Sequence, residues 1–256
     1  MPSLSKLLIL LLLLFPSDCL FADGISDYLR KGDEYFRAFD NQRALTEYQK
    51  AYSQNPRYAE TLQRMVRVYN DLGRIALRRD STSEQLYLKA VAYAESLLVH
   101  HPRNAASHFW VALAKGSLIP FRSTREKIRI GKDVRLHAQQ ALALDSTFSM
   151  TYVVLAIFER EGARLKWYEK AIVRVVFGTD LSGTLLQSEQ YLLTALKYDP
   201  KNSFALYELS STYRALENKQ KAIGALEQMI RLAPQNARER QLQEEAKRRL
   251  ERLRST

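Results

Sequence analysis

Cysteine is almost absent from this sequence of 256 residues, which contains one cysteine, seven prolines and nine glycines. A single cysteine excludes an internal disulfide framework and every metal site built from several thiolates. No two glycines lie closer than five residues apart, so a glycine-rich phosphate-binding loop is not expected either. The scarcity of helix breakers, combined with plentiful leucine, alanine and tyrosine, favours helices over strands.

Signatures of catalysis are also missing. The sequence has no G-x-S-x-G nucleophile motif and no H-E-x-x-H zinc motif, and no pair of its four histidines has the helical i, i+4 spacing. Glu159 and Glu161 stand two residues apart, which on a helix turns them to different faces. We therefore expect a protein that is not an enzyme and that uses no metal and no cofactor.

The one long apolar run lies near the N-terminus. Lys6 precedes an uninterrupted apolar stretch at residues 7–15. This layout is typical of a secretory signal peptide, and the stretch is too short to span a bilayer. We therefore expect residues 1–22 to be a signal peptide that is cleaved after Ala22, and the mature protein to be periplasmic. The alternative is an envelope lipoprotein anchored through Cys19, although the residue before that cysteine is acidic rather than small.

The charge balance is strongly basic. The 39 lysines and arginines exceed the 28 aspartates and glutamates, which gives a formal net charge of +11. In an intracellular protein this charge would favour nucleic acid as a partner. In an exported protein it suits an acidic partner protein, an anionic membrane surface or an envelope polymer instead, so we expect no nucleic-acid binding.

A repeated pattern organises the rest of the chain. In residues 25–58, aromatic residues, small residues and a proline fall at seven positions of one 34-residue frame, namely Tyr28, Gly32, Tyr35, Ala44, Tyr48, Ala51 and Pro56. Residues 203–236 fit the same frame. This is the pattern of a tetratricopeptide repeat (TPR), in which two antiparallel helices approach so closely that small residues must alternate with large rings.

Three further units lie between these two. The anchors that end the five units are Pro56, Pro102, Ser146, Pro200 and Pro234. Their intervals are 46, 44, 54 and 34 residues, so we expect insertions in the middle three units, near residues 73–87, 118–131 and 162–186. We predict an all-α solenoid of helical hairpins with about a dozen helices. Within the domain at 23–256, the units are expected at about 25–58, 59–104, 105–148, 149–202 and 203–236, and a capping helix at 237–254.

Three stretches resemble a known family. They are HFWVALAKG (108–116), REKIRIGKDVRLHAQQALALDSTF (125–148) and ARLKWYEKAIVRVVFGTDLSGTLLQSEQYLLTALKYDPKN (163–202). The last contains a WYxxxI…FG element formed by Trp167, Tyr168, Ile172, Phe177 and Gly178. Over about residues 60–235 the chain resembles the regulator of microtubule dynamics family. The resemblance implies a helical-repeat fold without an active site, but not microtubule binding, because an exported chain would meet no microtubule.

The concave face of the solenoid, which the first helix of each unit lines, is the expected binding surface. Its polar positions in units 1 and 2 include Arg37, Gln63, Arg67 and Asn70. An apolar strip follows in units 3 and 4, formed by Phe109, Leu113, Met150, Val153 and Ile157. Beyond the strip stand Arg160, Tyr207 and Arg214.

This face has two functional interpretations. The first is a scaffold that binds another protein or a peptide, and the alternative is a carrier or sensor that holds a hydrophobic or lipid ligand in the apolar strip. A purely structural explanation also exists, because apolar residues on helices are usually core and the insertion at 167–177 could cover the strip.

A basic stretch stands out at residues 121–135. Its cations are Arg122, Arg125, Lys127, Arg129, Lys132 and Arg135. Long cationic side chains normally extend into water, so a solvated loop and helix start would explain them. The alternative is contact with an anionic membrane, where each cation near the lipid surface contributes about 1 kcal/mol.

Overall fold

The computed structural model describes residues 18–76, 81–166 and 182–255, together with 170–171, 173–175 and 178. Most of the predicted signal peptide, residues 1–22, therefore lies outside the described residues. The described residues form twelve helices, one of them a 3-10 helix, and contain no strand. The prediction of an all-α helical-repeat solenoid is confirmed. In this described part, no helix is both long and apolar enough to cross a membrane.

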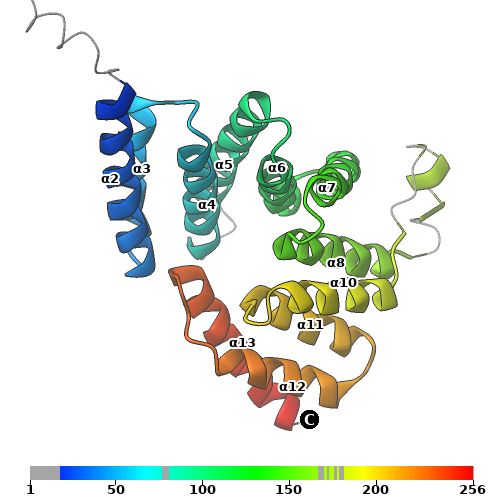
Figure 1. The fold of residues 1–256 in the computed structure, drawn as a ribbon. Coiled ribbons are helices and arrows are strands. Elements are labelled where there is room, and N and C mark those ends of the chain that lie inside the picture. Colours follow the sequence, from blue (N-terminus) through cyan, green and yellow to red (C-terminus); the bar gives the residue numbers. More distant parts are fainter. Residues whose placement is uncertain are drawn as a thin grey trace, which may run out of the picture.

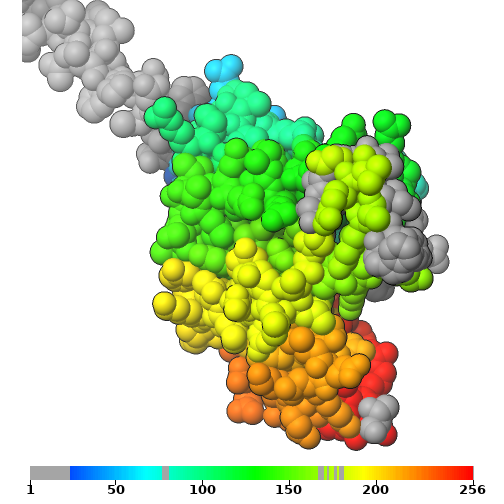
Figure 2. Space-filling view, turned by 90° about the vertical axis from the view of Figure 1, so that its right-hand side faces the viewer, coloured from blue at the N-terminus to red at the C-terminus, as the bar shows by residue number. Residues whose placement is uncertain are grey.

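Five antiparallel hairpins follow one another along the chain (Figure 1). They pair α2 (Asp18–Arg37) with α3 (Asn41–Gln54), α4 (Ala59–Ile75) with α5 (Ser81–His100), α6 (Ala105–Leu118) with α7 (Thr124–Leu144), α8 (Ser149–Arg164) with α10 (Leu185–Tyr198), and α11 (Ser203–Ala215) with α12 (Lys219–Ile230). The 3-10 helix η1 (Ile119–Phe121) lies between α6 and α7, and α13 (Ala237–Ser255) follows the last hairpin. Figure 2 shows the units stacked in chain order, from green through yellow to orange and red.

Two of the expected insertions lengthen a helix instead of forming a loop. The second helices α5 and α7 have 20 and 21 residues, whereas their counterparts α3 and α12 in the uninterrupted units have 14 and 12. The start of α7 is fixed by a capping box, in which both the backbone N–H and the hydroxyl of Ser123 donate to Glu126 Oε2. The third insertion separates α8 from α10. Four residues of its WYxxxI…FG element lie outside the described residues, namely Trp167, Tyr168, Ile172 and Phe177.

Polar residues fix the ends of the hairpins. At residues 55–58, 145–148 and 199–202, the first side chain accepts a hydrogen bond from the backbone N–H two residues later, which forms a tight turn between units. Inside the two 34-residue units, Phe39 and Glu217 adopt positive φ angles of 66° and 58°. The residues that follow them, Asp40 and Asn218, cap the next helix.

Close helix contacts hold the first hairpin together. A Cβ atom added at Gly32 on α2 would lie 2.3 Å from the ring of Tyr48 on α3, so only glycine allows this approach. Tyr48 is fully buried, as are Ala44 and Ala51 on the same helix. The alternation of small residues and rings therefore produces the helix contact that the repeat frame requires.

The last helix, α13, does more than cap the solenoid. Its apolar stripe is buried against α11 and α12 through Leu242, Ala246 and Leu250. Its first turn also reaches back to the second unit, where Arg238 forms an ion pair with Asp71 of α4. The neighbouring Arg240 guanidinium lies 4.5 Å from the centre of the Phe39 ring. The array of hairpins thus curves so far that α13 contacts α4 (Figure 1). This contact encloses the concave face.

Candidate binding site on the concave face

The enclosed concave face contains a cavity of about 840 Å³. Its lining comes from α4, α5, η1, α6, α7, α8, α11 and α13. The apolar wall is formed mainly by Leu113, Ile119, Phe121, Val154, Ile157 and Phe158. A volume within the range of about 300–1,000 Å³ is typical of ligand-binding clefts.

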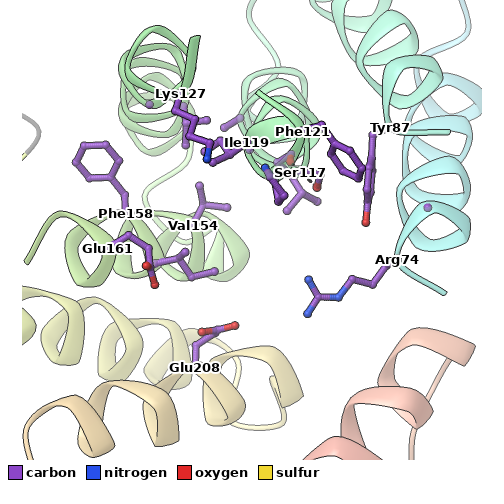
Figure 3. Close-up of a pocket in the computed structure, with 18 of the residues that line it drawn as sticks. Arg74, Tyr87, Ser117, Ile119, Phe121, Lys127, Val154, Phe158, Glu161 and Glu208 are labelled. Carbon is purple, nitrogen blue, oxygen red and sulfur yellow. Dashed lines mark hydrogen bonds between the residues drawn. The ribbon is translucent and has the colours of Figure 1, made fainter. Parts of the chain in front are cut away.

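Charged side chains face the same cavity. Arg74 points into it from the end of α4, and Glu208 points into it from α11 (Figure 3). Lys127 and Glu161 line it from α7 and α8, and Arg238 lines it from α13. The cavity therefore combines an apolar wall with charged groups of both signs, an arrangement that suits an amphipathic occupant.

Four glycines inside helices also line the cavity, namely Gly73, Gly116, Gly131 and Gly162. Glycine in a helix costs about 1 kcal/mol relative to alanine, so a glycine there calls for a reason. A Cβ atom added at Gly116 would make only an ordinary van der Waals contact, 3.8 Å from a methyl carbon of Val134, so close packing does not require glycine there. Gly73 has a packing reason, because an added Cβ would lie 2.9 Å from the ring of Tyr87. An isolated glycine such as Gly116, which has no such close contact, is a sequence signal that could have pointed to the cavity and that the sequence-based predictions did not use.

The structure divides the apolar strip that was expected in units 3 and 4. Leu113 and Ile157 line the cavity. Met150 is half-buried between two core clusters. Phe109 and Val153 are each only 3% exposed and belong to the core, which corrects the expectation that they face the groove.

The correction has a simple geometric cause. Most of the residues of α6 and α8 that line the cavity lie in the C-terminal halves of these helices, with Val154 as the exception, whereas Phe109 and Val153 in the N-terminal halves pack in the core clusters. The ring of Phe109 accordingly lies 4.8 Å from that of Phe148, which precedes α8. Position along the helix, and not only the helical face, therefore decides which residues reach the cavity.

The polar residues expected in units 1 and 2 make internal contacts. Arg67 donates from Nη2 to Asp33 Oδ1 at 3.1 Å, which joins the first two units. Asn70 is only 2% exposed, and its Oδ1 accepts a hydrogen bond of 2.7 Å from Ser117 Oγ. The other two lie outside the cavity lining, namely the exposed Arg37 and the half-buried Gln63. The structure thus does not bring these four together into one groove surface, because α4 packs tightly between unit 1 and α6.

The last three predicted groove residues, Arg160, Tyr207 and Arg214, do come together. They line a second depression of about 360 Å³, which we call the arginine pocket, with Arg74, Arg164, Glu208, Ser211, Ala215 and Arg249. Arg160 is 6% exposed, and its Nη2 lies 2.7 Å from Glu208 Oε2. Arg249 Nη2 donates to the hydroxyl of Tyr207 at 2.6 Å. Arg74 and Glu208 line both spaces, so the arginine pocket adjoins the cavity.

The basic stretch at 121–135 does not form one cationic surface. Arg122 pairs with Glu84, and the guanidinium of Arg135 lies 5.5 Å from the centre of the Phe158 ring. Lys127 lines the cavity, and Lys132 is half-buried. Arg125 and Arg129 remain exposed one turn apart on α7. Arg122 precedes α7, and helical periodicity distributes the other five cations around that helix, which explains the difference from a single patch.

Two histidines from different helices meet in the third hairpin. The Nδ1 atoms of His108 and His137 lie 3.1 Å apart, and His108 Nε2 lies 3.0 Å from the carbonyl oxygen of Pro102. When His108 is neutral and donates its Nε2–H to that carbonyl, its Nδ1 accepts a hydrogen bond from the Nδ1–H of His137. Among the described residues, no group of three or more histidine, cysteine or acidic side chains could hold a metal ion.

Five hairpins around a concave cavity define a helical-repeat protein of the TPR type, and solved structures share this fold. A thermophilic TPR protein from Thermus thermophilus superposes with a TM-score of 0.63 at 16% identity, covering 87% of this chain and 98% of that one. Pseudomonas aeruginosa pilF superposes with a TM-score of 0.50 at 15% identity, covering 91% and 93%. At these identities the likeness shows the fold alone.

Sequence comparison shows the family. The model of the family "Regulator of microtubule dynamics protein 1-3" matches residues 28–254, and the chain belongs to this family. It is 25% identical over 222 residues to regulator of microtubule dynamics protein 1 of Bos taurus, covering 86% of this chain and 68% of that protein. It is 27% identical over 163 residues to protein 3 of Rattus norvegicus, covering 63% and 34%.

The match is wider than the resemblance expected at 60–235. It begins in α2 and runs into α13, so the first unit and the last helix are family features as well. The chain spans only part of its relatives, namely 68% of the Bos taurus protein 1, 51% of the Homo sapiens protein 1 and 34% of the Rattus norvegicus protein 3.

Proposed function

We propose that this protein is a non-catalytic scaffold of the cell envelope, which holds a segment of a partner protein in its enclosed concave face. The observation that carries this proposal is the cavity of about 840 Å³ between the first helices and α13. First helices of such repeats present an extended concave surface, and an amphipathic peptide segment offers apolar side chains to such a groove. The apolar wall of the cavity suits the apolar side chains of such a segment, and the charged groups of the cavity suit its polar side chains.

The envelope location rests on the character of residues 1–22, which have the layout of a secretory signal peptide. Intact-mass analysis of the protein isolated from its own cells tests this part. We expect a mature chain that begins at Asp23. A full-length mass, or an acyl group on Cys19, would contradict cleavage after Ala22.

The apolar wall also favours a second candidate, a carrier of a hydrophobic or lipid ligand. Leu113, Ile157 and Phe158 give the cavity a lining that an acyl chain could fill. The charged groups Arg74 and Glu208 at its edge would then meet the polar end of the ligand. The two candidates differ in the chemical nature of the occupant and agree on its position.

Photo-crosslinking identifies the occupant directly. A photoreactive phenylalanine analogue at position 113 would place the crosslinker in the cavity, and the same analogue at Leu136 would serve as control, because Leu136 is 52% exposed on the outer side of α7. Mass spectrometry of the position-113 product from native cells is expected to show a peptide of another protein. A crosslinked lipid would replace the scaffold by the carrier. Equal products from both positions would remove the cavity as the binding site.

A cavity-filling variant provides the matched control. Gly116 lines the cavity, and an added Cβ would make only an ordinary van der Waals contact, 3.8 Å from a methyl carbon of Val134, so we expect the side chain of Gly116→Leu to extend into the cavity. We expect this variant to keep its helical circular dichroism and to lose the specific crosslink from a photoreactive analogue placed at position 157, which also lines the cavity. Retention of the crosslink in a folded Gly116→Leu variant would show that the occupant lies elsewhere.

A further inference from the structure

We propose that the arginine pocket binds carboxylate groups of an acidic segment in the partner, next to the apolar contacts that the same segment makes in the cavity. This inference rests on the proposed function, because it names the chemistry of the same occupant. Arginine is unusually concentrated in the lining of this pocket. Five arginines line the pocket from α4, α8, α11 and α13, namely Arg74, Arg160, Arg164, Arg214 and Arg249.

Three of these arginines are held by neighbouring side chains. Arg160 pairs with Glu208 at 2.7 Å, and Arg164 pairs with Glu161 at 2.9 Å. Arg249 donates to Ser211 Oγ at 2.7 Å as well as to the hydroxyl of Tyr207. These contacts make a firm wall, because each guanidinium is fixed by at least one short polar contact.

The other two arginines have no such contact. Within the described residues, the side chains of Arg74 and Arg214 form no hydrogen bond and no ion pair, and both residues are exposed to solvent. Each stands in the last turn of a first helix, where a cation is favoured by the helix dipole. The dipole explains one cation at each helix end. It does not explain why two open guanidinium groups line the same depression.

The charge of the pocket is not balanced by the protein. Glu208 is its one acidic lining residue, and even with the adjacent Glu161 and Glu245 the five arginines outnumber the carboxylates by two. Burial lowers the pKa of Arg249, and the positive charge of Arg214 lowers it further. A bound carboxylate would relieve this repulsion, since an opposite charge favours the charged form of arginine.

The position of the pocket identifies the occupant as an acidic peptide segment. Arg74 and Glu208 line both the arginine pocket and the apolar cavity, so one ligand can reach both spaces. Guanidinium groups bind carboxylates in a planar, two-point geometry, and two open ones on different helices suit two carboxylates of one chain. The net charge of +11 also attracts an acidic partner over a longer range.

Selection from a random dodecapeptide display library tests the inference. The three targets are the mature wild type, the variant R74Q/R214Q, and the control R103Q/R248Q. Arg103 and Arg248 are exposed and line neither space, so the control loses the same charge elsewhere. We expect wild type and control to enrich peptides in which Asp or Glu stands beside apolar residues. The strongest synthetic peptide should bind R74Q/R214Q about tenfold more weakly or worse, as expected for lost hydrogen bonds to charged groups.

The outcomes separate this inference from the proposed function. Enriched peptides without acidic residues, or equal affinity of the best acidic peptide for wild type and R74Q/R214Q, would overturn the inference and leave peptide binding intact. No enrichment by the wild type would overturn both. Cosedimentation with phosphatidylglycerol vesicles, lost in R74Q/R214Q and present in the control, would overturn the acidic segment in favour of a lipid head group. Both mutated arginines are exposed, so circular dichroism should show unchanged folding in every variant.

Discussion

Asp71 on α4 and Arg238 on α13 form an ion pair in the interior, with 3.5 Å between Oδ1 and Nη1. Their side chains are 6% and 18% exposed, and the guanidinium also lies 4.4 Å from the centre of the Phe204 ring. The pair joins the last helix to the second unit and so closes the cavity. Burial raises the pKa of Asp71 and lowers that of Arg238, while the charge of each partner opposes these shifts. Desolvation therefore outweighs the attraction within the pair.

We expect Asp71→Ala to lower the free energy of unfolding by about 3–5 kcal/mol, because Arg238 would keep a buried charge without its partner. Urea denaturation measures this change. The double variant Asp71→Leu, Arg238→Met should recover most of the loss, since apolar replacement of a buried pair is often neutral. A single variant as stable as the wild type would show that this pair does not hold α13 against α4.

Two glycines on first helices should respond oppositely to the same substitution. Gly32→Ala would place a Cβ 2.3 Å from the ring of Tyr48, and such overpacking typically costs about 1–3 kcal/mol. Gly116→Ala would place its Cβ in ordinary van der Waals contact with Val134 at 3.8 Å, without a clash, and the better helix propensity of alanine should add up to about 1 kcal/mol. Thermal melts of the two variants decide the matter, and equal shifts would contradict the assigned helix contacts.

Val153 and Leu113 belong to the same apolar strip in the sequence analysis, but Val153 is core and Leu113 lines the cavity, so the same substitution should affect them differently. Val153→Asp would bury an unpaired carboxylate in the core and should cost several kcal/mol, enough to unfold or aggregate the protein. Leu113→Asp points to the cavity, where water can solvate the carboxylate, so its melting temperature should fall much less. The same Leu113→Asp variant should lose binding of the occupant. Equal destabilisation by both substitutions would place Leu113 in the core.

Asp33 should make stability sensitive to acid. It accepts hydrogen bonds from Tyr48 at 2.7 Å and from Arg64 at 2.8 Å. Burial alone would raise its pKa, but the hydrogen bonds from Arg64 and Tyr48 lower it below the ordinary 3.8. Because the pKa of Asp33 is lower in the folded state than in the unfolded chain, its carboxylate stabilises the folded protein at every pH above the unfolded-state pKa. This contribution is lost as the pH falls through the folded-state pKa.

We therefore expect the free energy of unfolding to decrease below about pH 4. Asp33→Asn should lower stability at pH 7 by about 1–3 kcal/mol, because charged hydrogen bonds are weakened, and should flatten the slope in acid. Urea denaturation at several pH values provides the comparison. An unchanged slope in Asp33→Asn would assign the acid sensitivity to other carboxylates.

Local patterns encode the individual hairpins. In the first unit, Gly32 and Tyr48 are in contact at the positions that the repeat frame assigns to a small residue and a large ring. The turn after Asn55 follows from side-chain hydrogen bonds within a few residues. The helical continuation of two insertions was not predicted, although the capping box of Ser123 and Glu126 is visible in the sequence. Such features depend on neighbours in the chain, so the sequence alone reveals them.

The sequence by itself thus determined the helical class, the five paired units, the capping stripe of α13 and the basic charge. Which residues meet on the enclosed concave face depends on the tertiary structure alone. The curvature of a solenoid accumulates from small rotations between repeats, and no single repeat contains it. This curvature brings Arg238 into contact with Asp71. It also gathers Arg74, Arg160 and Arg214 at one pocket. Packing between the units buries Phe109 and Val153, whereas Leu113 and Ile157 line the cavity. On α6, Phe109 and Leu113 stand one turn apart, and on α8, Val153 directly precedes the cavity-lining Val154, yet in each pair the first residue is core. Packing against the neighbouring units sets that distinction.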